Sequence, residues 1–207
     1  MDCLLIRTRK IAGENLLLAG VCDGVGSTAE GGTAASTTLR LLLEWFDALS
    51  DTERIGLRLR NALLEINETI RQTMNQEERR AATTASVLLL RGDTYYLVHI
   101  GDSRIYLLEQ DTLMQLTVDQ SEGGKLTQYI GQAENLFPQY GEGSVSSGLF
   151  LLCSDGLFKR VQSHEIQKEL HKLKPKQIKK CIENLADCAI QRGEADNITI
   201  AIVMIER

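Results

Sequence analysis

The chain has 207 residues, of which 43% are hydrophobic and 25% charged, and its formal net charge is −5. This length and composition are typical of a globular protein that buries a core without disulfides, and the negative charge argues against nucleic acid or an acidic membrane as the main partner. The five cysteines form no CxxC pair, and the chain shows neither a signal-peptide pattern nor an apolar run approaching about 18 residues. We therefore expect a cytoplasmic protein with reduced thiols.

The first half of the chain predicts a strand, two helices and a run of short strands. The apolar run LLLAGV precedes Asp23, and no element is predicted for the segment MDCLLIRTRKIAGEN before it. Helical patterns cover 29–49 and 52–74, and the second repeats apolar residues three and four positions apart. Runs rich in β-branched and aromatic residues from 83 to 117 predict an antiparallel meander.

The second half begins with a polar, glycine-rich stretch, 120–148, for which no element is predicted. The elements expected after it are a strand over 149–155, helices over 163–170 and 175–191, and a last strand over 197–205. Helices segregated from antiparallel strands are typical of an α+β fold. No low-complexity linker divides the chain, so we expect one domain spanning residues 1–207.

Four apolar strands each carry an aspartate at one end, namely Asp23, Asp102, Asp155 and Asp196. Asp-Gly turns would explain any one of them, but the segments DGVGS and DGLF lead into long helical or irregular stretches and not into hairpins. Four converging carboxylates repel one another at pH 7, and a hard divalent cation such as Mg²⁺ or Mn²⁺ removes that conflict. Such an oxygen-only site suits phosphoryl chemistry through a metal-activated water. The three histidines have no ligand spacing and are interpreted as surface or packing residues.

Six ordered blocks make the pattern much more specific: VCDGVGS, TTASVLLL, VHIGDSRIYLL, LTVDQS, LFLLCSDGLF and GEADNITIAIV. In this order and at roughly this spacing, the chain resembles the bacterial-type metal-dependent PPM (type 2C) Ser/Thr protein phosphatases over about residues 17–203. The resemblance implies a four-layer αββα sandwich, with two antiparallel sheets flanked by helix pairs. It also implies a signalling hydrolase that removes phosphate from proteins phosphorylated by a Ser/Thr kinase, acts as a monomer and has neither a nucleic acid nor a membrane as partner.

The resemblance also assigns roles at a binuclear site of Mn²⁺ or Mg²⁺, with a third, weaker ion in bacterial members. Asp23 matches the carboxylate that bridges both core ions, and the carbonyl of Gly24 matches a ligand of the second ion. Asp155 and Asp196 match ligands of the first ion, and Asp102 matches the position that helps to hold the third. Thr83 and Thr84 match a block of the family that is interpreted as structural. Asn197 is expected to brace Asp196.

The chain departs from the family pattern in three places. Arg7 is the best match to the phosphate-binding arginine, with Arg9 behind it, and Glu14 is the nearest candidate for a missing N-terminal acid; a solvated charged edge is the alternative for all three. The usual D-H-S motif is Asp119-Gln120-Ser121 here. The flap of two short helices that usually follows is reduced to a short loop, which leaves the site more open.

Two functions from different classes remain open at this point. The leading one is a Ser/Thr phosphatase in which Asp23, Asp155, Asp196 and Arg7 carry the chemistry. The alternative is a degenerate phosphatase fold that binds a phosphoprotein or partner without turnover, and a hydrolase of small phosphoesters is a third possibility because fold does not fix substrate.

Overall fold

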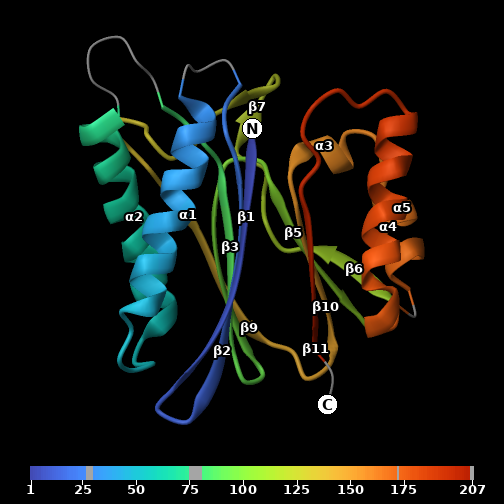
Figure 1. Cartoon of the computed structure of the whole chain (residues 1–207), viewed down its shortest axis with the longest axis horizontal. Coiled ribbons are helices and arrows are strands. Elements are labelled where there is room, and N and C mark those ends of the chain that lie inside the picture. The colour runs from blue at the N-terminus through green and yellow to red at the C-terminus, as the bar shows by residue number, and fades with distance from the viewer. Residues whose placement is uncertain (27–29, 75–80, 172, 206–207) are drawn as a thin grey trace.

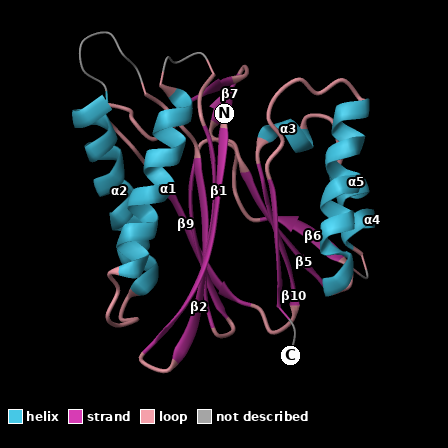
Figure 2. Ribbon diagram, in the orientation of Figure 1, coloured by secondary structure: helices cyan, strands magenta, loops and turns pink. Residues whose placement is uncertain are grey.

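Two antiparallel sheets lie face to face, and helices cover both outer faces (Figures 1 and 2). The computed structural model describes residues 1–26, 30–74, 81–171 and 173–205. The first sheet has the order β1 (Asp2–Ile11), β2 (Glu14–Asp23), β3 (Ala85–Arg91), β4 (Thr94–Ile100), β9 (Gln139–Ser144). The second has the order β11 (Ile200–Ile205), β10 (Gly148–Cys153), β5 (Arg104–Glu109), β6 (Thr112–Gln115).

The helices divide between the two sheets. The first sheet is covered by α1 (Gly31–Asp47) and α2 (Ile55–Met74), and the second by α3 (Asp155–Phe158), α4 (Ser163–Leu170) and α5 (Ile178–Gln191) (Figure 1). A 3₁₀ turn, Pro175–Gln177, leads into α5, and β7 (Ser121–Glu122) and β8 (Lys125–Leu126) form a separate small hairpin. The α+β class and the αββα layering predicted from the sequence are therefore confirmed.

Three apolar clusters separate the four layers. Leu89 of β3 packs toward α1 and α2, whereas its neighbour Leu88 faces the space between the sheets. In the second sheet, Leu152 of β10 faces the same inter-sheet space and Leu151 packs toward α4 and α5. Because neighbouring side chains in a strand point to opposite faces, these central strands are apolar on both sides and need cover from both.

The predicted meander is divided between the two sheets. Strands β3 and β4 pair in the first sheet, and β5 and β6 pair in the second. The chain crosses between them over 101–103, where Gly101 has a φ of +106°. The local sequence pattern predicted these strands correctly, but it did not predict that the chain passes from one sheet to the other between β4 and β5.

Four strands lie where no element was predicted: β1, the short β7 and β8 of the small hairpin, and β9. Strand β1 pairs with β2 along its whole length, but it is an edge strand, and apolar residues lie on both of its faces near the N-terminus, so it lacks a polar–apolar alternation. Strand β9 contains Gly141 and Gly143, which leave room for the side chains of Leu97 and Tyr95 on β4. Glycine is unusual in strands, and this composition concealed the element.

Candidate metal centre

The four predicted aspartates lie at one end of the sandwich. Asp23 ends β2 in the first sheet, Asp155 begins α3 directly after β10, and Asp196 lies in the loop before β11. Burial, followed by the charge of Asp2 and then those of Asp155 and Asp196, raises the pKa of Asp23 to about 8. The structure therefore brings together acids from both sheets that are up to 173 residues apart in sequence, Asp23 and Asp196 being the extremes.

Asp102 belongs to the same group. It lies in the segment that crosses between the sheets, and burial, followed by the charge of Asp155, raises its pKa to about 6. The backbone before it is fixed by two hydrogen bonds, because the Gly101 N–H donates to Gln120 Oε1 at 2.8 Å and the Gln120 N–H donates to the Gly101 carbonyl at 2.7 Å. Gln120, which replaces the usual histidine of the motif, thus holds the Asp102 loop.

Asp2 is a fifth acid of this site, and the sequence reasoning missed it. It lies directly opposite Asp23 in the β1–β2 register, and both of its carboxylate oxygens are buried without a hydrogen-bond partner. A two-residue turn at Ala12-Gly13, where both residues have positive φ, sets this register. The residue numbers of each opposing pair add up to 25, from Ile11 opposite Glu14 at the turn to Asp2 opposite Asp23 at the far end. Counting back from that turn would have found Asp2.

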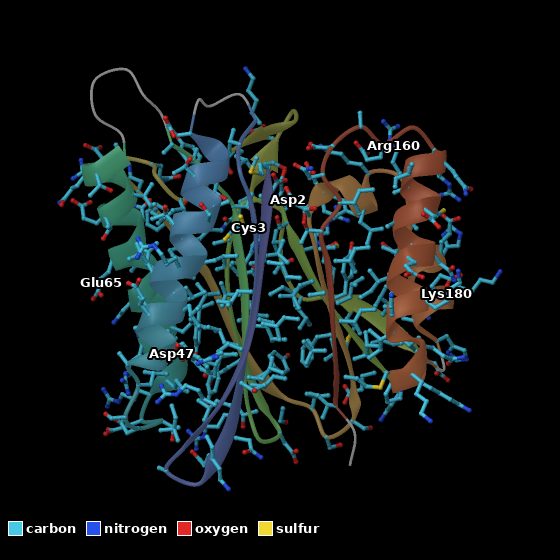
Figure 3. All side chains as sticks on the ribbon, in the orientation of Figure 1. Asp2, Cys3, Asp47, Glu65, Arg160 and Lys180 are labelled. Atoms are coloured by element: carbon cyan, nitrogen blue, oxygen red, sulfur yellow. The ribbon has the colours of Figure 1, made fainter. Side chains whose placement is uncertain are left out.

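Arg7 does not lie at this site, which contradicts its predicted role. It is five residues from Asp2 along β1, roughly 16 Å in an extended strand, and its Nε pairs with Asp47 Oδ1 at 3.3 Å. Asp2 and Asp47 lie well apart in Figure 3. The Arg9 guanidinium donates to the carbonyls of Phe46 and Asp47 at 2.6 and 2.7 Å, so it caps the end of α1.

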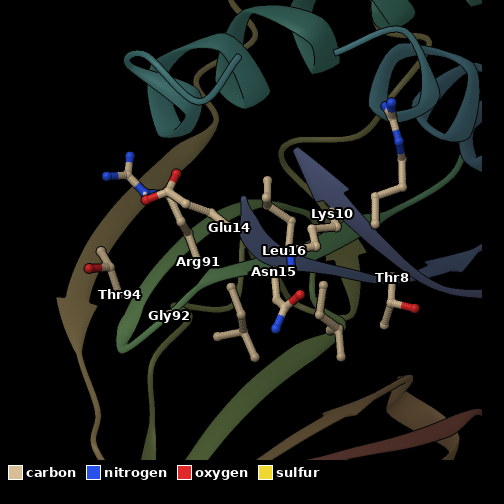
Figure 4. A pocket seen from close by; sticks show the side chains of 11 residues that line it. Thr8, Lys10, Glu14, Asn15, Leu16, Arg91, Gly92 and Thr94 are labelled. Atoms are coloured by element: carbon tan, nitrogen blue, oxygen red, sulfur yellow. Dashed lines mark ion pairs between the residues drawn. The ribbon is translucent and has the colours of Figure 1, made fainter. Parts of the chain in front are cut away.

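Glu14 lies farther still from the acids, at the start of β2. Its carboxylate accepts a hydrogen bond from Thr52 Oγ1 at 2.7 Å and pairs with Arg91 Nε at 3.3 Å. It lines a surface hollow of about 860 Å³ together with Lys10, Asn15 and Arg91 (Figure 4). The prediction that Glu14 replaces an N-terminal acid of the site is wrong, and Asp2 occupies that place.

The backbone of Asp23 is held on both sides by two threonines. Its N–H donates to Thr84 Oγ1 at 2.9 Å, and its carbonyl accepts from Thr83 Oγ1 at 2.9 Å and from the Thr84 N–H at 2.8 Å. Thr84 Oγ1 also lies 2.8 Å from Ser103 Oγ in the crossing segment. The structural role predicted for this threonine pair is confirmed, and it ties Asp23 to the loop of Asp102.

A second clamp joins the segments that carry Asp155 and Asp196. The Thr199 N–H donates to Ser154 Oγ at 3.0 Å, and the Ser154 N–H donates to the Thr199 carbonyl at 3.1 Å. Any side chain at Gly156 would overlap the Asn197 carbonyl, so the Asp-Gly pair is needed for this close approach. Asn197 braces Asp196 through its backbone, whose N–H donates to Asp196 Oδ1 at 2.8 Å.

One cation lies against these acids. Lys159 Nζ is 2.5 Å from Asp155 Oδ2, one turn further along the chain, and the charges of Asp196 and Asp102 also act on it. This lysine was not among the residues predicted for the site. An i,i+4 spacing after an aspartate is a weak local signal that could have identified it.

The region expected to be a reduced flap contains no helix. Residues 120–138, all of which the structure describes, form the β7–β8 hairpin and an irregular segment. The hairpin lies at the same end of the molecule as the N-terminus and α3 (Figure 1). The acids are therefore not covered by a helical flap.

The donor set fits hard divalent ions. Besides the two oxygens of Asp2, Asp155 Oδ1 is buried without a hydrogen-bond partner, and carboxylate oxygens are the ligands that Mg²⁺ and Mn²⁺ prefer. Within the described part of the chain, no three acidic, histidine or cysteine side chains stand close enough to form a ready-made shell.

Known proteins resemble this chain both in sequence and in fold. The family model for protein phosphatase 2C matches residues 6–193. Protein phosphatase PhpP of Streptococcus pneumoniae is 32% identical over 93% of this chain and 86% of its own length. Serine/threonine phosphatase stp of Listeria welshimeri is 30% identical over 92% and 85%. The solved Streptococcus agalactiae serine/threonine phosphatase has the same fold, with a TM-score of 0.83, 24% identity and coverage of 100% of this chain and 99% of that one.

The chain belongs to the protein phosphatase 2C family. It is an enzyme of the phosphatase class, as the recurrent sequence blocks predicted. No helix in the described ranges is both long and apolar enough to cross a membrane.

Proposed function

We propose that this chain is a metal-dependent protein phosphatase that hydrolyses phosphoserine and phosphothreonine. The observation that carries the proposal is that the charges of Asp155 and Asp196, which flank strands of the second sheet, both act on the half-buried Asp23 at the end of β2 in the first sheet. The names of the relatives support the substrate class. We further propose that the chain acts as a single domain and a monomer in the cytoplasm, on proteins phosphorylated by a Ser/Thr kinase.

Two core ions, Mn²⁺ or Mg²⁺, would be held by Asp23, the Gly24 carbonyl, Asp155 and Asp196, with Asp102 near a third. Such ions supply a water of lowered pKa and neutralise phosphoryl oxygens. The role of this chain is to hold the ligands still, through Thr83 and Thr84 on one side and Ser154 on the other. Preorganised groups of this kind lower the cost of reorganisation during reaction.

A covalent route through a cysteine is disfavoured by the position of Cys153. This thiol is fully buried in β10, and burial raises its pKa to about 12. A nucleophilic cysteine needs thiolate character and access, and Cys153 has neither. Direct attack by water on phosphorus is therefore the proposed route.

The test uses p-nitrophenyl phosphate and a phosphothreonine peptide, each with Mn²⁺, with Mg²⁺ and with EDTA. Turnover of the peptide with metal and its loss in EDTA are expected. Asp155→Asn should lower kcat/KM at least about 100-fold, because it removes a ligand charge, whereas the exposed Asp187→Asn on α5 should leave it unchanged. Peptide binding without turnover would favour the alternative of a non-catalytic binding module.

A further inference from the structure

Lys159 stands on the solvent side of the acidic group. Its side chain is 53% exposed, whereas that of its partner Asp155 is only 13% exposed. The ammonium therefore approaches the acids from outside, where a substrate must also approach. The stem that carries it extends from the end of α3, which is anchored beneath by the apolar side chain of Leu157.

The charges of the site favour such a cation. With only the two core ions bound, the five carboxylates of Asp2, Asp23, Asp102, Asp155 and Asp196 exceed the four positive charges of the ions. A phosphate monoester adds up to two more negative charges. A positive side chain at the mouth of the site offsets part of this repulsion.

The neighbouring arginines are committed elsewhere. Arg104 forms a paired contact with Asp119, at 2.6 Å for the shorter distance, and its guanidinium lies 3.6 Å from the ring centroid of Phe158. Arg160 pairs with Glu194 at 3.0 Å. Neither arginine is available to a substrate. The side chain of Lys159 is half-exposed, and its partner Asp155 is a proposed metal ligand, so ion binding would free the lysine.

We propose that Lys159 is a phosphate-binding residue of this site and fills the role first predicted for Arg7. When Asp155 serves as a metal ligand, the Lys159 ammonium is released from it and donates hydrogen bonds to a non-bridging phosphoryl oxygen. No bond to phosphorus is made or broken by the lysine, and it keeps its proton. The inference rests on the proposed function, because it assigns a substrate contact to the same site.

The experiment compares Lys159→Gln, Lys159→Arg and a control, Lys179→Gln. Lys179 lies on α5 with 90% of its side chain exposed, so the control makes the same change in net charge away from the site. Two dissociation constants are measured: that of Mn²⁺, from the electron paramagnetic resonance signal of the free ion, and that of inorganic phosphate for the Mn²⁺-loaded protein, by calorimetry.

Lys159→Gln should weaken phosphate binding by about tenfold or more, the usual value of a charge-assisted hydrogen bond. It should leave Mn²⁺ binding equal or tighter, because it removes a cation that competes for Asp155. Lys159→Arg should stay within about threefold of the parent for phosphate, and Lys179→Gln should change neither constant.

Unchanged phosphate affinity in Lys159→Gln, with Mn²⁺ still bound, would overturn the proposal. A parallel loss of Mn²⁺ affinity would also overturn it, since Lys159 would then support the fold of the metal site. Because both constants are measured without turnover, a failure of the proposed function appears separately, as a protein that binds Mn²⁺ and phosphate but hydrolyses no phosphopeptide.

Discussion

At the scale of single residues, Asp2 on the edge strand β1 lies directly opposite Asp23 on the neighbouring strand β2. Burial raises the cost of ionising Asp23, and the charge of Asp2 adds to that cost. This arrangement opposes folding in the absence of metal and favours it once an ion is bound. The same pair therefore makes the stability of the protein depend on metal and on pH.

Asp2→Asn should separate these two effects. In EDTA and above pH 8, where Asp23 is ionised, the new amide can donate a hydrogen bond to Asp23 where a carboxylate repels it, so we expect Tm to rise by about 2–4 °C, corresponding to roughly 1 kcal/mol. The affinity for Mn²⁺ should weaken by about tenfold to a hundredfold. Thermal unfolding with and without Mn²⁺ measures both, with the exposed Asp187→Asn as control. A lower Tm in EDTA would contradict the unfavourable pairing of Asp2 with Asp23.

The raised pKa of Asp23 predicts a loss of stability with rising pH. The folded chain holds the Asp23 proton up to about pH 8, whereas the unfolded chain releases it near pH 4. The folded state therefore binds more protons in this window, and its contribution to stability is lost as pH rises through 8. Burial lowers the pKa of His99 to about 4, so His99 does not titrate in the folded chain between about pH 6.5 and 8.5, where the effect of Asp23 is measured.

We expect the Tm of the EDTA-treated protein to fall between pH 6.5 and 8.5, and Asp23→Asn to remove most of that slope. Saturating Mn²⁺ should flatten or reverse it, because the ion favours the ionised carboxylate. A Tm in EDTA that is flat or rises across this window would show that Asp23 ionises without cost.

At the scale of elements, the segment between β4 and β5 determines where the site lies. Gly101 turns the chain out of the first sheet with a φ of +106°, and a Cβ added there would lie 2.6 Å from Thr84 Cγ2. Thr84 in turn holds the backbone of Asp23. The corner thus joins both sheets and two of the acids through one close contact.

Gly101→Ala should lower the free energy of unfolding by about 2 kcal/mol or more, from backbone strain together with the clash on Thr84. Gly13→Ala is the matched control, because Gly13 also has a positive φ, +88°, but has nothing within 4 Å of the added Cβ. It should cost only about 1 kcal/mol. Urea unfolding measures both variants, and equal losses would show that the contact with Thr84 contributes nothing.

At the scale of the whole molecule, the metal centre lies at an end of the sandwich that no helical flap covers. The β7–β8 hairpin is the regular structure between Gln120 and Pro138. Little surface is therefore available to hold a peptide on either side of its phosphate. Binding energy from remote parts of a substrate should be small, and truncated substrates should lose little in rate.

We accordingly expect kcat/KM for p-nitrophenyl phosphate and for a phosphothreonine peptide to differ by less than about tenfold, or roughly 1.4 kcal/mol in transition-state binding. Both are measured under one metal condition. A preference of a thousandfold for one peptide sequence would show that another surface of the protein recognises the substrate.

The amino-acid sequence by itself determined the fold class, the four longer helices and the four strand-end aspartates, whereas the strand predicted over 149–155 ends at Cys153 and Asp155 begins the short helix α3. Each of these features is local, because an apolar run, an acid and a small residue lie within a few positions of one another, as in CSDG at Asp155. Their order along the chain then predicted the sandwich and the class of enzyme.

Only the tertiary structure decided which charges meet. Arg7 and Asp2 lie on the same strand, yet only Asp2 reaches the acids, because strand pairing fixes position along the sheet by register and not by residue type. Lys159 joins the site through the reach of its side chain, and Gln120 through hydrogen bonds to a corner between two sheets. These contacts depend on register, sheet crossing and rotamer, which are set by packing across the whole core and leave no pattern in a short stretch of sequence.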